Sequence, residues 1–247
     1  MPEIPDVVIL SGGFGLRLRG MIGDVPKPMA QIAGRPFLEL LLRQLKRHGF
    51  SRVVLSVGYK QEVIREHFGE KAFGLELVYS IETSPLGTGG ALREAARHIR
   101  TETALVMNGD SYTDVDLSRL VREHAGNDAD VTVVVIPESR TDAGSVVLDR
   151  KGKVKAFAEK RHVPESRYLS AGIYMLSKSL IAGIPQGSKI SLEEQIFPQW
   201  LADGRSIEGF VCEGQCLDIG TPERYMTAQH ALEKVELETY IQTEGRS

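Results

Sequence analysis

Residues 6–28 read DVVILSGGFGLRLRGMIGDVPKP, a short apolar run followed at once by a loop rich in glycine and positive charge. The run predicts a buried strand, and ligands of an α/β sheet bind where such strands end. Glycines let backbone N–H groups approach phosphate oxygens, while Arg17 and Lys27 supply charge, the lysine held between two prolines. The stretch predicts a strand and a phosphate-binding loop. A glycine-rich turn with solvated arginines is the alternative, because the loop matches neither a Walker A motif nor G-x-G-x-x-G.

Strand and helix patterns alternate along the first half of the chain. Further apolar runs predict buried parallel strands at 53–57, 75–79, 104–107 and 131–136. Amphipathic patterns between the runs predict helices within 36–49, 61–69, 89–99 and 116–126. Asp116 is the expected N-cap of the last of these helices. Such βαβ repetition predicts a mostly parallel sheet with helices on both faces, a Rossmann-like three-layer α/β sandwich.

The second half of the chain has a different pattern. Strand patterns separated by turn residues, which suggest antiparallel or mixed pairing, occur at 145–149, 153–160 and 168–176. Ser191 and Glu194 have the spacing of a capping box, and Pro222 fits the first position of a final helix. We therefore expect one domain over 1–247, with halves at 1–136 and 137–220 and a C-terminal helix and tail at 221–247.

The composition excludes several classes of protein. The 247 residues carry a formal charge of −3, so net charge does not favour a nucleic-acid or anionic membrane partner. No apolar run approaches the roughly 20 residues that span a bilayer, and the N-terminus does not resemble a signal peptide. Cys212 and Cys216 lack the companion ligands of a zinc site and are expected to be reduced thiols. These features predict a soluble, cytoplasmic protein.

An ordered series of motifs resembles the sugar-1-phosphate nucleotidyltransferases. The glycine loop and VPKPM open the series, and five stretches follow in the family's order: LGTGGAL (86–92), NGDSY (108–112), FAEK (157–160), SAGIY (170–174) and LDIGTPERY (217–225). The resemblance covers nearly the whole chain, and the order is more specific than any single motif. It implies a reaction between a nucleoside triphosphate and a sugar 1-phosphate, with Mg²⁺ as cofactor, and makes the partly antiparallel second half a sugar-binding lobe.

The resemblance assigns roles to individual residues. It makes Arg17, Lys27 and Asp110 catalytic, with Asp110 and Asp218 as the metal ligands, although a turn aspartate and a helix-capping carboxylate are the structural alternatives. The nucleotide-binding residues it implies are Leu10, Gly12, Gly13, Gly15, Glu82, Gly87, Thr88 and Gly89. The implied sugar-phosphate-binding residues are Gly109, Glu159, Lys160, Ala171 and Gly172. The chain departs from the family at Ser170, where asparagine is more usual.

Glu82 bears on the choice of base. Guanine presents two adjacent donors, N1–H and the exocyclic amine, and a carboxylate accepts from both. Glu82 therefore favours GTP, although an exposed acid at a strand end is the alternative. Within the family the chain most resembles short guanylyltransferases acting on D-glycero-α-D-manno-heptose 1-phosphate.

Two other functions fit parts of this pattern. Hexose or N-acetylmuramate 1-phosphate uridylyl-, thymidylyl- or guanylyltransferase activity is the alternative within the family. A non-catalytic nucleotide-sugar sensor would be expected to lose Arg17, Lys27 or a metal carboxylate, and all of these are present. By analogy with the family, a homodimer is expected.

Overall fold

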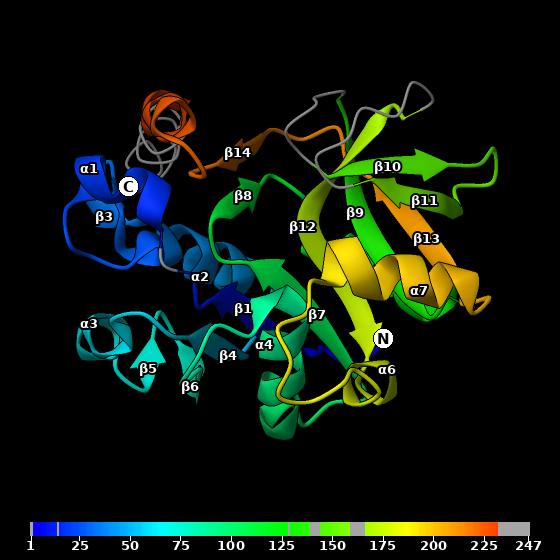
Figure 1. Cartoon of the computed structure of the whole chain (residues 1–247), viewed down its shortest axis with the longest axis horizontal. Coiled ribbons are helices and arrows are strands. Elements are labelled where there is room, and N and C mark those ends of the chain that lie inside the picture. The colour runs from blue at the N-terminus through cyan, green and yellow to red at the C-terminus, as the bar shows by residue number, and fades with distance from the viewer. Residues whose placement is uncertain (1, 14, 128, 139–143, 159–165, 232–247) are drawn as a thin grey trace, which may run out of the picture.

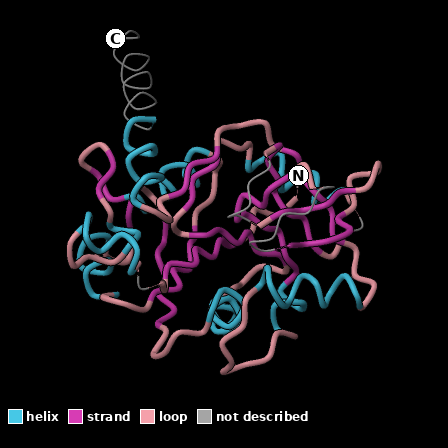
Figure 2. The backbone as a smooth tube through the Cα atoms, turned by 45° about the horizontal axis from the view of Figure 1, so that its top comes forward, coloured by secondary structure: helices cyan, strands magenta, loops and turns pink. Residues whose placement is uncertain are grey.

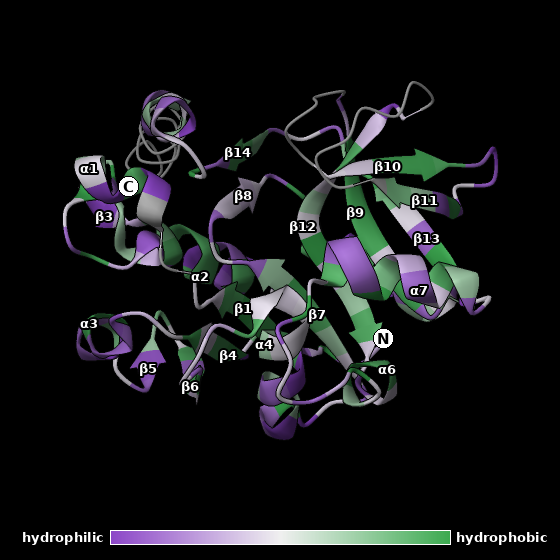
Figure 3. Cartoon of the chain, viewed as in Figure 1, coloured by the Kyte–Doolittle hydropathy of each residue, from purple (hydrophilic) through white to green (hydrophobic). Residues whose placement is uncertain are grey.

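The structure is a computed structural model, and it describes residues 2–13, 15–127, 129–138, 144–158 and 166–231. Over these residues ten strands form one sheet. Its centre is a parallel row in the order β7 (Thr103–Asn108), β1 (Asp6–Ser11), β4 (Arg52–Val57) and β6 (Leu75–Ile81). These strands are rich in Val, Ile and Leu because the row is covered on both faces, and Figure 3 colours β1 and β4 as hydrophobic.

Two apolar clusters cover the two faces of the sheet. Alternate residues of β1, such as Val7 and Ile9, pack with α2 (Phe37–Arg47), α3 (Gln61–Phe68) and α5 (Leu117–Gly126). The opposite face of the same strand, through Val8, packs with α4 (Gly87–Ala95), α6 (Lys178–Ala182) and α7 (Phe197–Ala202). Figure 2 shows the strands running through the middle with helices on both sides. The predicted three-layer α/β fold is confirmed.

The second half adds the antiparallel strands. β12 (Tyr168–Ser177) runs antiparallel to β7 on one side and to β9 (Val131–Pro137) on the other. The prediction of a buried parallel strand at 131–136 is confirmed in burial and direction, because β9 runs in the same direction as β7, although the antiparallel strand β12 lies between the two. The apolar run indicated burial on both faces, and burial does not identify the adjacent strand. β13 (Ile207–Val211) pairs in parallel with β9.

The predicted antiparallel strands of the second half are confirmed. β10 (Ser145–Leu148) pairs antiparallel with β11 (Val154–Ala158) and with the first residues of β12 (Figure 1). The register of β12 shifts between Ser170 and Tyr174, where Gly172 has a φ of +70°. β12 pairs with β10 before this irregularity and with β7 after it.

Shorter elements connect these parts. They are the helical turns Leu16–Leu18, α1 (Arg19–Ile22), Lys27–Met29 and Ala96–His98, the π-helix Leu192–Ile196, and the strands β2 (Gln31–Ile32), β3 (Arg35–Pro36), β5 (Lys71–Ala72), β8 (Ser111–Thr113) and β14 (Cys216–Asp218). A final helix begins at residue 222, as predicted, and is described to residue 231. Cys212 and Cys216 do not form a disulfide bond. Among the described helices, none has the length and hydrophobicity needed to cross a bilayer.

The predicted caps can be compared with the hydrogen bonds. Asp116 accepts from the Arg119 N–H at 2.8 Å and caps α5 as expected. Ser191 Oγ accepts from the Glu194 N–H at 3.1 Å, and the Ser191 N–H donates to Gln195 Oε1 at 2.9 Å. The predicted helix start at Ser191 is therefore confirmed. The side chain that accepts from the Ser191 N–H belongs to Gln195, because the first turn is a π-turn and brings the residue one place later back to the cap.

Candidate active site

A cleft of about 380 Å³ opens at the carboxyl ends of β1 and β7. Parallel strands place their carboxyl ends on the same edge of a sheet, so loops far apart in sequence meet there. Nine of the residues implied by the motif resemblance line this cleft: Leu10, Gly12, Gly13, Lys27, Glu82, Gly87, Thr88, Gly109 and Asp110. The nucleotide half of the predicted site is therefore assembled in one place.

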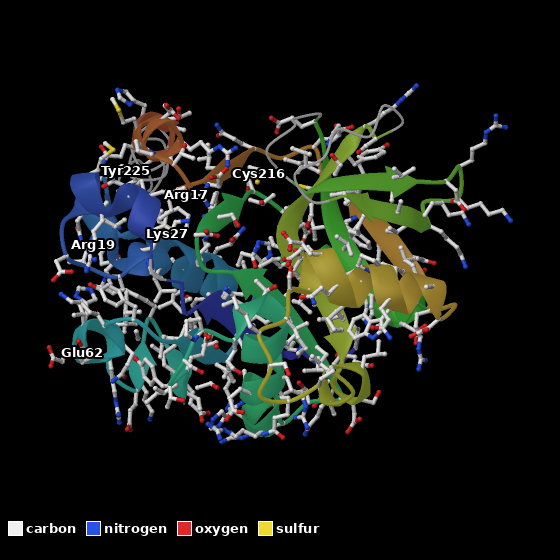
Figure 4. All side chains as sticks on the ribbon, in the orientation of Figure 1. Arg17, Arg19, Lys27, Glu62, Cys216 and Tyr225 are labelled. Carbon is white, nitrogen blue, oxygen red and sulfur yellow. The ribbon has the colours of Figure 1, made fainter. Side chains whose placement is uncertain are left out.

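Six implied residues lie outside the cleft lining. Arg17 is exposed on the helical turn 16–18, and in the view of Figure 4 it lies between Lys27 and the helix that carries Tyr225. The others are Gly15, Gly89, Ala171, Gly172 and Asp218, each within a few residues of a lining residue in sequence or in the sheet. Glu159 and Lys160 lie outside the described residues. The roles of all these residues stay predictions.

The glycine loop packs tightly against other parts of the cleft. A Cβ on Gly12 would overlap the carboxylate of Glu82, so only glycine lets the loop pass this close to that side chain. Gly15 has a φ of +60°, and a Cβ there would lie 3.1 Å from the Cβ of Lys27. Both positions therefore use the missing side chain, one for close approach and one also for the left-handed backbone.

Lys27 and Asp110 form an ion pair inside the cleft. The lysine Nζ lies 2.5 Å from Asp110 Oδ2, and the side chains are 12% and 44% exposed. Pro26 and Pro28 flank the lysine, which begins the helical turn Lys27–Met29, while Asp110 follows directly on β7. The pair joins the glycine loop to the NGD turn and places a cation and an anion where phosphates are expected.

Asp24 anchors the far end of the glycine-rich loop. Its carboxylate accepts from Lys60 Nζ at 2.5 Å, from the Tyr59 hydroxyl at 2.6 Å and from Arg19 Nη2 at 2.9 Å. The hydrogen bond from Lys60, followed by those from Tyr59 and Arg19, holds the pKa of Asp24 well below its usual range. This cluster ties the loop after β1 to the loop after β4.

Asp218 comes next to the NGD turn through a short strand pair. β14 pairs antiparallel with β8 so that Asp218 is opposite Ser111, and the Ile219 N–H donates to the Asp110 carbonyl at 2.9 Å. Asp218 Oδ1 accepts from the Gly220 N–H at 2.8 Å and from Arg224 Nη1 at 3.1 Å. Two carboxylate residues from distant parts of the chain thus lie on neighbouring backbone segments.

Glu82 is half-buried in the same cleft, with its carboxylate beside Gly12. Its carboxylate accepts from Ser56 Oγ at 3.2 Å and from the Leu86 N–H at 3.3 Å. Burial raises the pKa of Glu82, and these two hydrogen bonds partly oppose that increase. The carboxylate is therefore held in a fixed place with acceptor capacity to spare.

Three polar cleft residues were not singled out from the sequence. Ser11 Oγ and Asn108 Oδ1 are buried without a hydrogen-bond partner, and both residues line the cleft. Buried polar atoms are normally paired, so these two are candidates for contact with a ligand. Each lies inside a quoted motif, which was the available signal. Lys189 also lines the cleft, and nothing in its local sequence points to it.

Glu193 connects the two halves behind the cleft. Its carboxylate accepts from Thr88 Oγ1 on α4 at 2.9 Å and from the Tyr174 hydroxyl on β12 at 2.9 Å. The Tyr174 hydroxyl in turn lies 3.1 Å from Ser170 Oγ, which accepts from the Gly172 N–H at 3.2 Å. This chain of bonds runs from the glycine-rich start of α4 to the SAGIY strand. Ser170, the departure from the family pattern, is part of it.

Comparisons with known proteins agree with this geometry. A family model described as Nucleotidyl transferase matches residues 6–235. The chain is 40% identical over 224 residues to a mannose-1-phosphate guanylyltransferase of Mycobacterium tuberculosis, in an alignment covering 90% of this chain and 62% of that protein. It is 35% identical over 228 residues to a D-glycero-alpha-D-manno-heptose 1-phosphate guanylyltransferase of Aneurinibacillus thermoaerophilus, covering 92% and 98%. The chain thus spans less than two thirds of the first relative and nearly all of the second.

A solved structure shares the fold over its full length. HddC from Yersinia pseudotuberculosis, complexed with GMP-PN, superposes with a TM-score of 0.80 at 32% sequence identity. The superposition covers 93% of this chain and 100% of that chain. The similarity extends across both halves of the molecule, including the antiparallel strands.

Proposed function

The chain belongs to the nucleotidyl transferase family, and on that premise we propose that it transfers GMP from GTP to a sugar 1-phosphate. The proposed sugar substrate is D-glycero-α-D-manno-heptose 1-phosphate, and the products are GDP-heptose and pyrophosphate. The observation that carries the proposal is the cleft in which the Lys27–Asp110 pair and the glycine loop face the same space as Glu82. That arrangement supplies contacts for phosphates and for a base within one cleft.

The reaction needs little covalent help from the protein. A phosphate oxygen of the sugar 1-phosphate attacks the α-phosphorus of GTP, one P–O bond forms, and the bond to the β-phosphate oxygen breaks to release pyrophosphate. The nucleophile is already an anion, so the protein must hold two anions together and stabilise charge on the leaving group. In the proposed mechanism the backbone N–H groups of Gly12 and Gly13, together with Arg17, bind the pyrophosphate. Lys27 neutralises charge near the α-phosphate.

The carboxylates suit a hard divalent cation. Asp110 and Asp218 lie on adjacent backbone segments, and carboxylate oxygens are the ligands that Mg²⁺ prefers, with phosphate oxygens and water completing its shell. Each carboxylate now balances a basic side chain, Lys27 or Arg224. Within the described residues no group of three or more His, Cys, Asp or Glu side chains is arranged to hold a metal ion. When bound, Mg²⁺ would neutralise phosphate charge.

Glu82 supports guanine as the base. A carboxylate accepts from N1–H and from the exocyclic amine of guanine together, whereas uracil and thymine present one donor between two acceptors. The fixed position of Glu82, between Ser56 and the Leu86 N–H, suits this use. Mannose 1-phosphate is the second candidate sugar, because the chain is 40% identical to a mannose-1-phosphate guanylyltransferase.

The experiment that tests this proposal is a pyrophosphate-release panel. GTP, UTP, dTTP and ATP are crossed with heptose, mannose, glucose and N-acetylmuramate 1-phosphates, with Mg²⁺ and with Asp110→Asn as the inactive control. We expect release with GTP and the heptose phosphate. Release with UTP or dTTP would refute the guanine assignment. Nucleotide binding without release in any combination would favour a sensor over an enzyme.

We also propose a homodimer, which sedimentation of the purified chain would test. A monomer at micromolar concentration would contradict it.

A further inference from the structure

A segment of the second half of the chain lies against the start of α4 and borders the cleft. The residues between α6 and the π-helix run over the start of α4, as Figure 1 shows. The Gly89 N–H donates to the Ile190 carbonyl at 2.8 Å, and the Ile190 N–H donates to the Leu86 carbonyl at 2.9 Å. Cβ atoms on Gly87 and Gly90 would lie 2.5 Å from the backbone oxygens of Ile190 and Ser188. Residues 188–190 are therefore held at a fixed place.

This anchoring carries Lys189 to the cleft. Lys189 lines the cleft, its side chain is exposed, and within the described part of the chain it has no carboxylate partner. Lys27, the other lysine of the lining, is paired with Asp110. The ammonium of Lys189 is thus available to a ligand.

Leu86 connects Lys189 to Glu82. The Leu86 N–H donates to Glu82, and the Leu86 carbonyl accepts from Ile190, the residue next to Lys189. One residue therefore links the carboxylate expected to bind the base to the segment that carries the lysine. Lys27 and Asp110, expected at the phosphates, belong to other elements of the cleft.

The chemistry of guanine gives this lysine a role. With N1–H and the exocyclic amine on Glu82, the remaining polar edge of guanine is O6 and N7, both acceptors. A lysine ammonium has three donors and no acceptor. We propose that Lys189 reads the O6/N7 edge of the guanine whose other edge is bound by Glu82, an inference that rests on the proposed use of GTP. A purine with an amine at position 6 would place a donor against this cation.

Base analogues separate the two contacts. Inosine triphosphate lacks the exocyclic amine that faces Glu82, 7-deaza-GTP lacks N7, and 6-thio-GTP weakens the acceptor at position 6. The variants are Lys189→Met, Lys189→Arg and Glu82→Gln, with Lys151→Met as the control at an exposed lysine on a turn far from the cleft residues in sequence. Steady-state pyrophosphate release reports kcat and KM for each pairing.

The expected pattern is specific to each variant. Lys189→Met should lower kcat/KM for GTP about tenfold, mainly through KM, as expected for loss of one charge-assisted hydrogen bond. With at least one of 7-deaza-GTP and 6-thio-GTP, Lys189→Met should lower kcat/KM by less than about twofold, because the wild type already lacks that contact with the analogue. Lys189→Arg should recover most of the loss, and Lys151→Met should match the wild type. Glu82→Gln should instead lower the ratio of kcat/KM for GTP to kcat/KM for inosine triphosphate.

Other outcomes would overturn the assignment. Equal loss on GTP and on both edge analogues would mean that Lys189 acts on the phosphates, and no loss at all would mean that it does not touch the nucleotide. If the wild type does not use GTP, the proposed function fails first, and that result is visible before any variant is measured.

Discussion

Replacing Gly87 with alanine tests whether the segment 188–190 is packed on α4 as the structure shows. Gly87 has a φ of +68°, in the left-handed region. An added Cβ would lie 2.5 Å from the Ile190 carbonyl oxygen, which is backbone and cannot rotate away as a side chain would. Gly87→Ala must therefore strain the backbone and displace the segment.

The expected loss of stability follows from two contributions. A non-glycine residue in the left-handed conformation costs about 1–2 kcal/mol. Displacing Ile190 also breaks its hydrogen bonds with Gly89 and Leu86, each worth about 0.5–1.5 kcal/mol. Together these predict a loss of about 2–5 kcal/mol. For a chain of 150–250 residues each kcal/mol lowers Tm by about 2–4 °C, so the expected fall is about 4–20 °C.

The assay is thermal unfolding followed by circular dichroism, with Gly126→Ala as the matched control. Gly126 ends α5, is exposed, and an added Cβ there would meet no atom within 4 Å. The control should stay within about 2 °C of the wild type. The affinity of Gly87→Ala for GTP should also fall, because Lys189 moves with the segment. If Gly87→Ala has the same Tm as Gly126→Ala, the segment 188–190 does not pack on α4 as described.

Three further predictions concern other parts of the molecule. Burial raises the pKa of Glu82, so the ionised side chain destabilises the folded state at pH values above its folded pKa, whereas the protonated side chain carries no such cost below its unfolded pKa. Glu82→Gln should therefore raise Tm more near pH 8 than near pH 4. An equal change in Tm at both pH values would contradict this. Arg52→Met leaves the Asp6 carboxylate, 6% exposed, without its guanidinium at 2.8 Å, and urea unfolding should show a loss of about 3–5 kcal/mol. Thr88→Val and Glu193→Met each remove the hydrogen bond between Thr88 and Glu193, so the free energies of unfolding of the two variants should be non-additive by about 1 kcal/mol. Strict additivity would mean that the bond is absent in solution.

Local patterns were enough to predict the layers of the fold. The alternation of apolar runs and amphipathic stretches predicts strands and helices because burial and helical period are properties of neighbouring residues. The position of β12 between β7 and β9 could not be predicted in this way. Strand order depends on pairing between residues far apart in sequence, and two strands buried on both faces look alike whichever neighbours they have.

The candidate site divides along the same line. The glycine loop and Lys27 were indicated as part of the cleft from local sequence, because the loop carries its glycines and charged residues close together after a predicted strand. The meeting of Asp218 with the NGD turn was expected only from the family resemblance, and the bridge through Glu193 and the position of Lys189 beside α4 appear only in three dimensions. In each case a side chain is brought into place by backbone contacts with a distant segment. The sequence by itself therefore determined the kind of fold and the glycine-rich loop with Lys27 after β1, and the tertiary structure decided which distant side chains complete the candidate site.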